Sequence, residues 1–256
     1  KHIMKFKDLT PELHGELAGW LTTFPPKLVT TNIYGESLVE PAKHRKMALI
    51  PKDHYKTSLA SISLAPHVLI QPKETNIYIP GKAGNQSKIL LCGETEKEAS
   101  KSLALIESHF ENNAKLKALW PEVCWENPPR QSKKWNEKAM IIKRETLDRD
   151  ESIRVIGVDG AIQGSHPDVM IKDDICTWEA SQSPTVMRAT KDWHRQSRSL
   201  FENWDTDIEI IIGTPWALND IYQDIEKNEK LMQVYKRSMV EDGRTILPNK
   251  FKLEMV

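Results

Sequence analysis

One stretch constrains this chain most, because in it a short apolar run, a polar loop and a helix-forming segment follow one another. The run Met47 to Ile50 is typical of a buried strand, and an apolar helix follows from Lys56 and Thr57 towards Leu64. This order of strand, loop, Lys-Thr and helix is that of a phosphate-binding loop. The helix start offers unpaired N–H groups and the positive end of its dipole to an anion. We therefore expect Lys56 to reach the terminal phosphates of a nucleotide and the Thr57 hydroxyl to bind Mg²⁺.

The match to the standard phosphate-loop pattern is incomplete. Counting back from Lys56 and Thr57, Ile50 and Tyr55 occupy the two positions where that pattern has glycine. A charged turn between a core strand and a core helix explains this stretch equally well. The later motifs must distinguish the two interpretations.

The rest of the chain alternates between short apolar runs and amphipathic segments. Thr95, followed three residues later by Glu98, forms a capping-box pattern at the start of one predicted helix. The stretch 71–87 is polar and rich in turn residues, which predicts an exposed excursion. Strands that alternate with crossover helices indicate an α/β fold with a mainly parallel sheet. The predicted strands are 88–92, 140–142, 153–158, 168–175, 208–213 and 233–240, and the predicted helices are 9–21, 95–112, 116–120, 183–201 and 220–231.

Length and charge set limits on the class of protein. The chain has 256 residues, with 36 Lys and Arg against 36 Asp and Glu, which suits one large or two small domains. A neutral balance argues against a general nucleic-acid coat protein but leaves room for a local basic strip. Basic clusters at 43–46 and 130–144 are explained most simply as solvated surface. The three cysteines lie apart and have no metal-ligand spacing to histidines, which favours a reducing compartment. No apolar run is long enough to span a membrane, and no secretory signal is visible.

A second motif consists of an apolar run that ends in two adjacent carboxylates, Asp173 and Asp174. Ligands of open parallel sheets bind beyond the carboxyl ends of the strands. Neighbouring strand residues point to opposite sides, so the two acids can have separate roles. We expect Asp173 to hold Mg²⁺ opposite Thr57, directly or through water, and Asp174 to orient the attacking water. The alternative is an acidic turn in which Asp174 caps the next helix.

A third motif is the run 211–216, in which Gly213 and Thr214 end another buried strand at the same edge. Thr214 could sense the γ-phosphate through a hydrogen bond and pass its loss to a moving segment. The alternative is a turn in which Thr214 is only a local cap.

Taken in order, these motifs resemble the ATPase domain of the large terminase subunit, the motor that packages DNA into the heads of tailed phages. The resemblance covers nearly the whole chain. That family's phosphate loop is commonly Pro-Arg-Gly-His-Gly-Lys-Ser, and this chain has Pro51-Lys52-Asp53-His54-Tyr55-Lys56-Thr57. The other matching segments are 88–99, 113–122, 164–174 with the Walker B strand, and 212–222 with the coupling motif.

The resemblance implies a P-loop NTPase of the ASCE type, with a mainly parallel central sheet flanked by helices and a small N-terminal cap or lid. It divides the chain into an N-terminal helix and cap segment (1–40), a P-loop ATPase core (41–240) and the start of a linker (241–256). The family's nuclease domain follows that linker. Because the chain has no room for it, nuclease activity is not expected here.

The resemblance also implies an activity, namely Mg²⁺-dependent hydrolysis of ATP to move double-stranded DNA into a procapsid. The cofactors would be ATP and Mg²⁺. The implied site has catalytic residues Asp174, Lys56 and Lys52; nucleotide-binding residues Pro51, Lys52, Asp53, His54, Tyr55, Lys56 and Thr57; metal-binding residues Thr57 and Asp173; and the coupling residue Thr214.

The implied partners are double-stranded DNA, the portal protein, the small terminase subunit and further copies of the chain in a ring, with no membrane. The implied location is the host cytoplasm, transiently at the procapsid portal. A neighbouring subunit would supply a finger in trans, for which Arg144, Arg149 and Arg154 are candidates. The cluster Lys133–Lys143 is a candidate for DNA phosphate contacts.

The chain departs from the family at three positions. Lys52 stands where the family usually has Arg, so a γ-phosphate contact there would be a point charge rather than a fork. Tyr55 replaces the glycine beside Lys56, so the backbone must reach the phosphates despite a bulky side chain. Asp174 stands where many relatives have the longer Glu.

Two other functions remain open from the sequence. One is a helicase-like ATPase that acts on nucleic acid outside phage packaging. The other is a packaging assembly module whose glycine-poor loop no longer turns over ATP.

Overall fold

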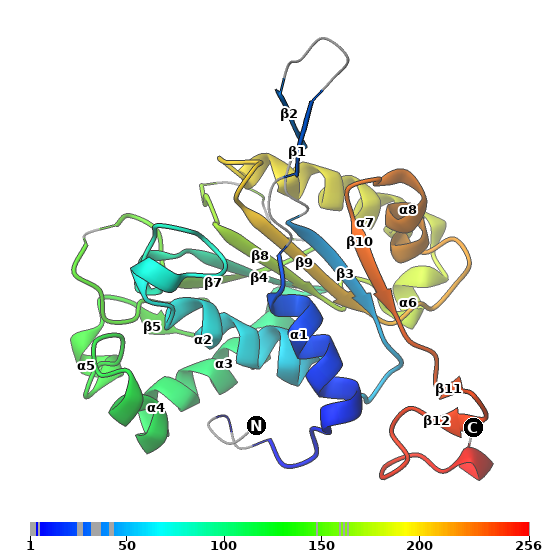
Figure 1. The fold of residues 1–256 in the computed structure, drawn as a ribbon, viewed down its shortest axis with the longest axis horizontal. Helices are drawn as coiled ribbons and strands as arrows, with labels where there is room; N and C mark the ends of the chain where they lie inside the picture. Colours follow the sequence, from blue (N-terminus) through cyan, green and yellow to red (C-terminus); the bar gives the residue numbers. More distant parts are fainter. Residues whose placement is uncertain are drawn as a thin grey trace.

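A central eight-stranded sheet organises the computed structural model, in the order β10-β3-β9-β8-β4-β7-β6-β5 (Figure 1). Neighbours from β10 to β7 pair in parallel, and β6 and β5 continue the sheet antiparallel. The structure describes residues 4, 6–24, 28–31, 37–40, 44–146, 148–158, 160, 162 and 164–255. The strands are β3 (Arg45–Leu49), β4 (Ile89–Gly93), β5 (Trp135–Asn136), β6 (Ala139–Met140), β7 (Ile153–Gly157), β8 (Val169–Asp173), β9 (Ile208–Gly213) and β10 (Gln233–Lys236).

The mainly parallel α/β fold that the sequence predicts is confirmed. In the sheet, β9 lies between β3, which leads into the phosphate loop, and β8, which ends at Asp173. This order agrees with the expected ASCE type. It places the ends of the three motif-bearing strands next to one another.

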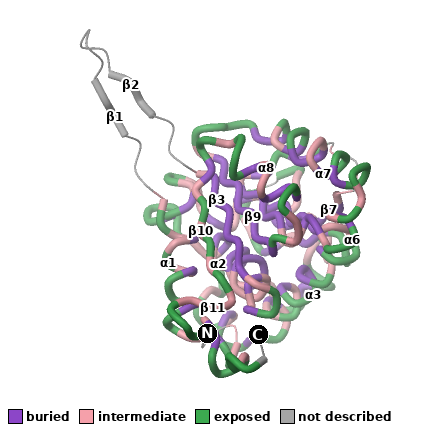
Figure 2. The backbone as a smooth tube through the Cα atoms, turned by 90° about the vertical axis from the view of Figure 1, so that its right-hand side faces the viewer, coloured by how far each residue is buried: buried purple, intermediate pink, exposed green. Residues whose placement is uncertain are grey.

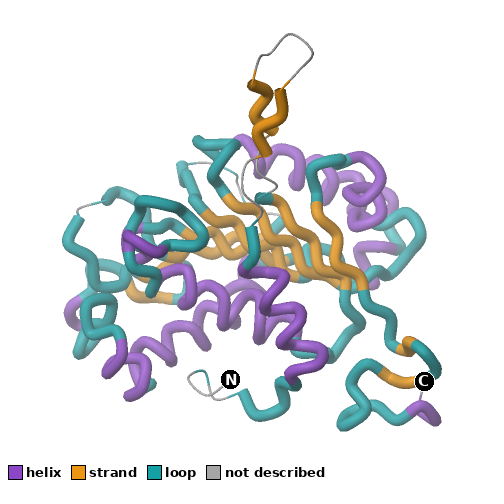
Figure 3. Tube along the Cα trace, in the orientation of Figure 1, coloured by secondary structure: helices purple, strands orange, loops and turns teal. Residues whose placement is uncertain are grey.

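Helices cover both faces of the sheet (Figures 1 and 3). Because strand side chains alternate between faces, Ala48 and Ile50 join one apolar core while Met47 and Leu49 join the other. The strands β3 and β9 are buried along their length between these cores (Figure 2). The first core contains residues of α1 (Glu16–Thr22), α2 (Leu64–Leu69), α3 (Glu96–Asn112) and α4 (Ala114–Leu119), and the second contains residues of α6 (Trp178–Ser181), α7 (Pro184–Ser197) and α8 (Ile221–Asn228).

Shorter elements complete the described chain. The pairs β1–β2 and β11–β12 are both antiparallel. No helix in the described ranges is both long and apolar enough to cross a membrane. The remaining elements are η1 (Pro11–Gly15), β1 (Leu28–Thr31), β2 (Ser37–Glu40), η2 (Ser58–Ser63), η3 (Lys73–Thr75), η4 (Gly84–Gln86), α5 (Pro128–Gln131), η5 (Arg198–Leu200), β11 (Val240–Glu241), β12 (Arg244–Thr245) and η6 (Leu253–Met255).

The predicted helix after the phosphate loop is present, but its first part, η2, is π-helical. There the N–H of Leu64 bonds the carbonyl of Leu59, five residues back. Pro66 has no N–H for a helical bond, and its ring would clash with the carbonyl of Ile62. This explains why a wider turn precedes it.

The stretch 71–87 is only partly the exposed excursion that its polarity predicts. Tyr78 is buried, and its hydroxyl lies 2.6 Å from Nδ1 of His67. The side-chain oxygen of the buried Asn76 accepts hydrogen bonds from the N–H groups of Tyr78 and Ile79. The polar side chain therefore stabilises a turn that inserts an aromatic ring into the core.

The basic cluster at 43–46 is not solvated surface, as far as the structure describes it; Lys43 lies outside the described residues. Arg45 and Lys46 belong to β3 and are buried. Lys46 Nζ donates to the carbonyls of Trp20 and Thr23 and lies 4.1 Å from the centre of the Phe24 ring. Burial lowers the pKa of Lys46 to about 8. Lys46 thus binds the end of the N-terminal helix α1, and Arg45 belongs to a buried cluster of charged side chains.

That cluster lies on the α7 face of the sheet, around Glu209 of β9 and Lys172 of β8, both fully buried. Glu209 accepts from Lys172 at 2.6 Å, from Arg45 at 2.8 Å and from Arg198 at 2.8 Å. Burial alone would raise the pKa of Glu209, but the charges of Lys172, His194 and Arg198 and the hydrogen bond from Arg198 hold it well below its usual range. His194 lies 2.9 Å from Lys172 and links it to Glu229. The cluster connects β3, β8 and β9 to the helical layer.

Replacing Glu209 by Gln should destabilise the protein strongly, because the buried Lys172 and Arg45 and the half-buried Arg198 would lose a shared counter-charge. We expect the free energy of unfolding in urea to fall by about 3–5 kcal/mol. The matched control is Glu226→Gln, which breaks the half-exposed pair with Lys236 and should cost about 0–1 kcal/mol. Similar losses in the two variants would contradict this account of the cluster.

Candidate functional site

The loop between β3 and η2 places Lys56 at the carboxyl edge of the sheet. Its side chain is almost fully buried. The ammonium donates to Thr214 Oγ1 at 2.8 Å and lies 3.0 Å from Asp174 Oδ2. Lys56 thus joins the ends of β3, β8 and β9 at one point.

Thr57 and Asp173 lie side by side, although 116 positions separate them in the sequence. Thr57 Oγ1 donates to Asp173 Oδ1 at 3.1 Å, and Ser61 Oγ donates to Asp173 Oδ2 at 2.7 Å. Ser61 was not predicted; its place one helical turn after Thr57, on the same helix face, was the available signal.

A divalent cation fits this arrangement. Burial, with a contribution from neighbouring Asp174, raises the pKa of Asp173 to about 7. The described hydroxyl and ammonium groups around Asp173 therefore do not fully compensate its negative charge. A hydroxyl and a carboxylate are also the oxygen ligands that Mg²⁺ prefers.

Asp174 and Thr214 do not act as helix caps, which was the alternative for each. The N-cap of α6 is Thr177 and that of α8 is Asp220. Asp174 instead has a left-handed backbone (φ 45°) and pairs with Lys56. Thr214 accepts from Lys56 and donates to the carbonyl of Ile50 at 3.3 Å.

These groups line a cavity of about 570 Å³. Lys52 also lies on its wall, and Glu94 and Glu98 approach it from the loop after β4 and the start of α3. The cavity therefore has lysines on both sides, Lys52 and Lys56 on the loop and Lys101 on α3, with carboxylates among them. This distribution suits a polyanion that arrives with a divalent cation.

Two residues of the phosphate loop, Asp53 and Tyr55, have left-handed backbones, with φ of 65° and 56°. They occupy the two glycine positions of the family loop quoted above. The substitution at Tyr55 was recognised from the sequence, and the one at Asp53 was not. The loop thus keeps a conformation suited to glycine although side chains are present, at a cost of about 1–2 kcal/mol for an ordinary residue.

Both ends of the chain contact this loop. His14 Nε2 lies 3.1 Å from the carbonyl of His54, and the His54 ring is buried and stacks on Phe251 at 4.9 Å. Lys250 donates to the carbonyl of Asp53 at 2.7 Å and lies 4.7 Å from the centre of the Tyr55 ring. The side chains of His54 and Tyr55 are therefore engaged in packing, and any nucleotide contact from them or from half-buried Pro51 stays a prediction.

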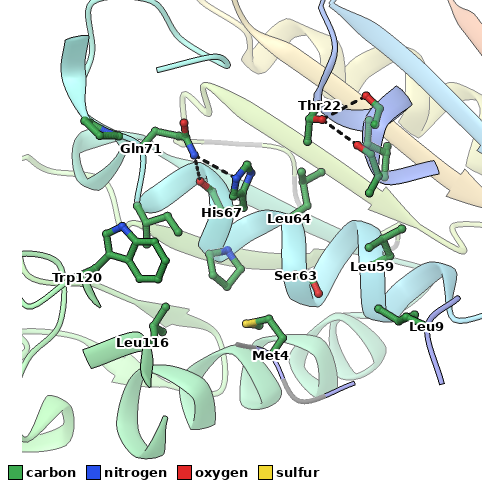
Figure 4. A pocket seen from close by; sticks show the side chains of 16 residues that line it. Met4, Leu9, Thr22, Leu59, Ser63, Leu64, His67, Gln71, Leu116 and Trp120 are labelled. Carbon is green, nitrogen blue, oxygen red and sulfur yellow. Dashed lines mark hydrogen bonds between the residues drawn. The ribbon is translucent and has the colours of Figure 1, made fainter. Parts of the chain in front are cut away.

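A second cavity, of about 740 Å³, lies between α1, α2 and α4 (Figure 4). Its wall is mostly apolar and includes Leu59, Leu64, Leu116 and Trp120. Its described lining contains no Lys, Arg, Asp or Glu. Its described lining therefore offers no Lys or Arg charge to a phosphate, although this cavity is larger than the first.

The candidate fingers and DNA contacts are not part of the phosphate site. Arg144, Arg149 and Arg154 are absent from the described cavity wall. In the basic cluster, Lys134 pairs with Glu151 and Lys138 with Glu96. Part of the cluster's charge is thus neutralised within the chain.

Comparison with known proteins gives six matching chains among solved structures, including two large terminases. The large terminase of bacteriophage HK97 aligns over 77% of this chain at 15% identity, with a TM-score of 0.45. The ATPase domain of the large terminase of Thermus phage P74-26 aligns over 75% of this chain and 75% of its own, at 14% identity and a TM-score of 0.42. The match spans 36% of the HK97 protein. Both are large terminases, the family that the motifs resemble. No family model matches the sequence, and no curated protein does.

Substitutions at Asp53 should report the strain in the phosphate loop. Asp53 is exposed, and its bond from Lys250 uses only the backbone carbonyl. We expect Asp53→Gly to raise the free energy of unfolding in urea by about 0.5–1 kcal/mol, because glycine adopts a left-handed backbone freely. The control Asp53→Ala should lower it by a similar amount. Equal effects of the two substitutions would show that the loop is not strained at this position.

Proposed function

We propose that this chain is the ATPase part of a viral DNA-packaging motor, a large terminase subunit that hydrolyses ATP with Mg²⁺ to move double-stranded DNA into a procapsid. The contact between Thr57 and Asp173 at 3.1 Å is the observation that carries the proposal. It joins a phosphate-loop hydroxyl to an acidic strand end across the sheet. Such a pair is the protein's share of a magnesium–nucleotide site.

Lys56 and the N–H groups at the start of η2 would hold the phosphates, with Lys52 assisting at the γ-phosphate. Thr57 and Asp173 would hold Mg²⁺, which neutralises charge on the phosphate oxygens. Lys56 is paired with Asp174 and Thr214. A γ-phosphate competes for the same ammonium, so its arrival would release the Asp174 carboxylate to orient water.

Thr214 is placed to transmit the loss of the γ-phosphate to the rest of the protein. Its hydroxyl bonds both Lys56 and the carbonyl of Ile50, so loss of the γ-phosphate would change the bonds at the end of β9. We infer that this change reaches a DNA-gripping surface, as the family resemblance implies. The portal protein, the small terminase subunit, a ring of copies and a site at the procapsid portal in the host cytoplasm belong to the same proposal.

The left-handed Asp53 and Tyr55 favour a second candidate, an assembly module that does not turn over ATP. Their side chains restrict how closely the backbone approaches a phosphate. Hydrolysis measurements separate this candidate from the motor.

Replacing Lys56 by Ala should abolish most ATP turnover, because the buried ammonium is the main cation for the phosphates. We expect Mg²⁺-dependent phosphate release to fall by about 10²–10³-fold. The control is Lys101→Ala, which removes another cation of the same cavity, one paired with Glu98, and should leave the rate within about twofold. Equal rates in wild type and Lys56→Ala would favour the assembly module.

The assembled motor should move along intact duplex DNA without separating its strands. We expect displacement of a third strand bound to the duplex, dependent on ATP and weakened by salt as phosphate contacts are screened. Release of single strands from a forked duplex would instead support the helicase-like alternative.

A further inference from the structure

The loop after β4 brings a third carboxylate, Glu94, to the edge where Asp173 and Asp174 lie. β4 and β8 pair in parallel, with Cys92 opposite Lys172. Continuing this register puts Gly93 level with Asp173 and Glu94 level with Asp174. Glu94 lines the same cavity as Lys56 and Thr57.

The position of Glu94 is fixed by its surroundings. A Cβ on Gly93 would lie 3.1 Å from both the N–H nitrogen of Ala99 and the carbonyl oxygen of Thr95, so the chain turns tightly against the start of α3. The carbonyl of Glu94 accepts a hydrogen bond from Val158 at 3.2 Å. The loop therefore has little freedom to move Glu94 away from the cavity.

Thr177 orients the Glu94 carboxylate. Its hydroxyl donates to Glu94 Oε1 at 2.7 Å and accepts from the N–H of Ala180 as the N-cap of α6. The single hydroxyl proton of Thr177 is therefore donated to Glu94. Glu94 Oε2 has no hydrogen-bond partner among the described residues and is left for another ligand.

Glu94 and Asp174 differ in the partners of their carboxylate oxygens. Asp174 Oδ2 pairs with Lys56, and its Oδ1 is buried without a partner in the described structure. Within those same residues no Lys or Arg nitrogen lies within 4 Å of the Glu94 carboxylate. Glu94 also has one more methylene, which gives it a longer reach.

We propose that Glu94 is a second catalytic carboxylate of this site and accepts the proton of the attacking water; this rests on the proposed ATPase function. The water oxygen forms a bond to the γ-phosphorus, and the bond from that phosphorus to the β–γ bridging oxygen breaks. ADP keeps the electron pair of the broken bond. The water proton passes to Glu94 Oε2 and then to solvent, while Asp174 and Thr177 position the water and the carboxylate.

Glu94→Gln tests this role, because the amide oxygen can still accept from Thr177 while the proton acceptor is removed. The matched control is Glu96→Gln, a carboxylate at the start of the same helix α3 that is not part of the described cavity wall and pairs with Lys138. The measurements are steady-state phosphate release, affinity for a fluorescent ATP analogue, and the identity of the nucleotide retained after one turnover time.

We expect Glu94→Gln to lower kcat by about 10²–10³-fold, to keep nucleotide affinity within about threefold and to retain ATP rather than ADP. Glu96→Gln should leave all three readouts near wild type. Thr177→Val should lower kcat by about tenfold with unchanged affinity, and Thr177→Ser should restore it. Glu94→Asp, which keeps the charge at shorter reach, should lie between wild type and Gln and provides the test should Glu94→Gln not fold.

A kcat of Glu94→Gln within about twofold of wild type would overturn the inference, while the Lys56-dependent hydrolysis of the wild type would keep the proposed function. A parallel loss of kcat and nucleotide affinity would assign Glu94 to binding and also overturn it. Wild-type protein without Lys56-dependent hydrolysis would overturn both.

Discussion

The structure depends on one buried ammonium group, that of Lys56, which holds three strand ends together. A buried charge is tolerated only with well-placed partners, and here they are Asp174 after β8 and Thr214 after β9. Because β9 lies between β3 and β8, the parallel order itself brings these partners within reach. The same order places Thr57 beside Asp173. The loop after β3, the acidic end of β8 and Thr214 are therefore one electrostatic unit.

The opposite face of the same strands carries a comparable unit. Lys172 precedes Asp173 on β8, so the alternation of strand side chains directs one into the Glu209 cluster and the other to the cavity. Glu209 and Arg45 extend this cluster across β9 and β3. The strands that form the site are thus fixed by packing and by ion pairs on the face away from the cavity. Because the sheet is held together from this face, Asp173 and Asp174 on the cavity side can lack a full set of hydrogen-bonding partners without destabilising it.

Most of the architecture could be predicted from the sequence, because short apolar runs and their spacing indicate where the strands and the helices between them lie. The strands, their parallel arrangement and the meeting of Thr57 with Asp173 follow from that pattern and from where parallel strands end. Glu94 could not be assigned in this way, because its role depends on which strands are neighbours. The burial of Arg45, Lys46 and Tyr78 also escaped prediction, since polar composition alone does not reveal a partner distant in sequence. Ser61 and the left-handed Asp53 were missed although each had a signal: Ser61 follows Thr57 by one helical turn, and Asp53 stands where the family loop has glycine.

The contacts of His14, Lys250 and Phe251 with the phosphate loop have a mechanical consequence. A loop with two strained backbone positions persists only when its surroundings over-determine it, and these surroundings come from opposite ends of the chain. Displacing the segment around Lys250 would remove its hydrogen bond to the carbonyl of Asp53 and free the loop backbone at that position. The C-terminal segment is therefore a mechanical brace, which helps to keep Asp53 and Tyr55 in their left-handed conformation.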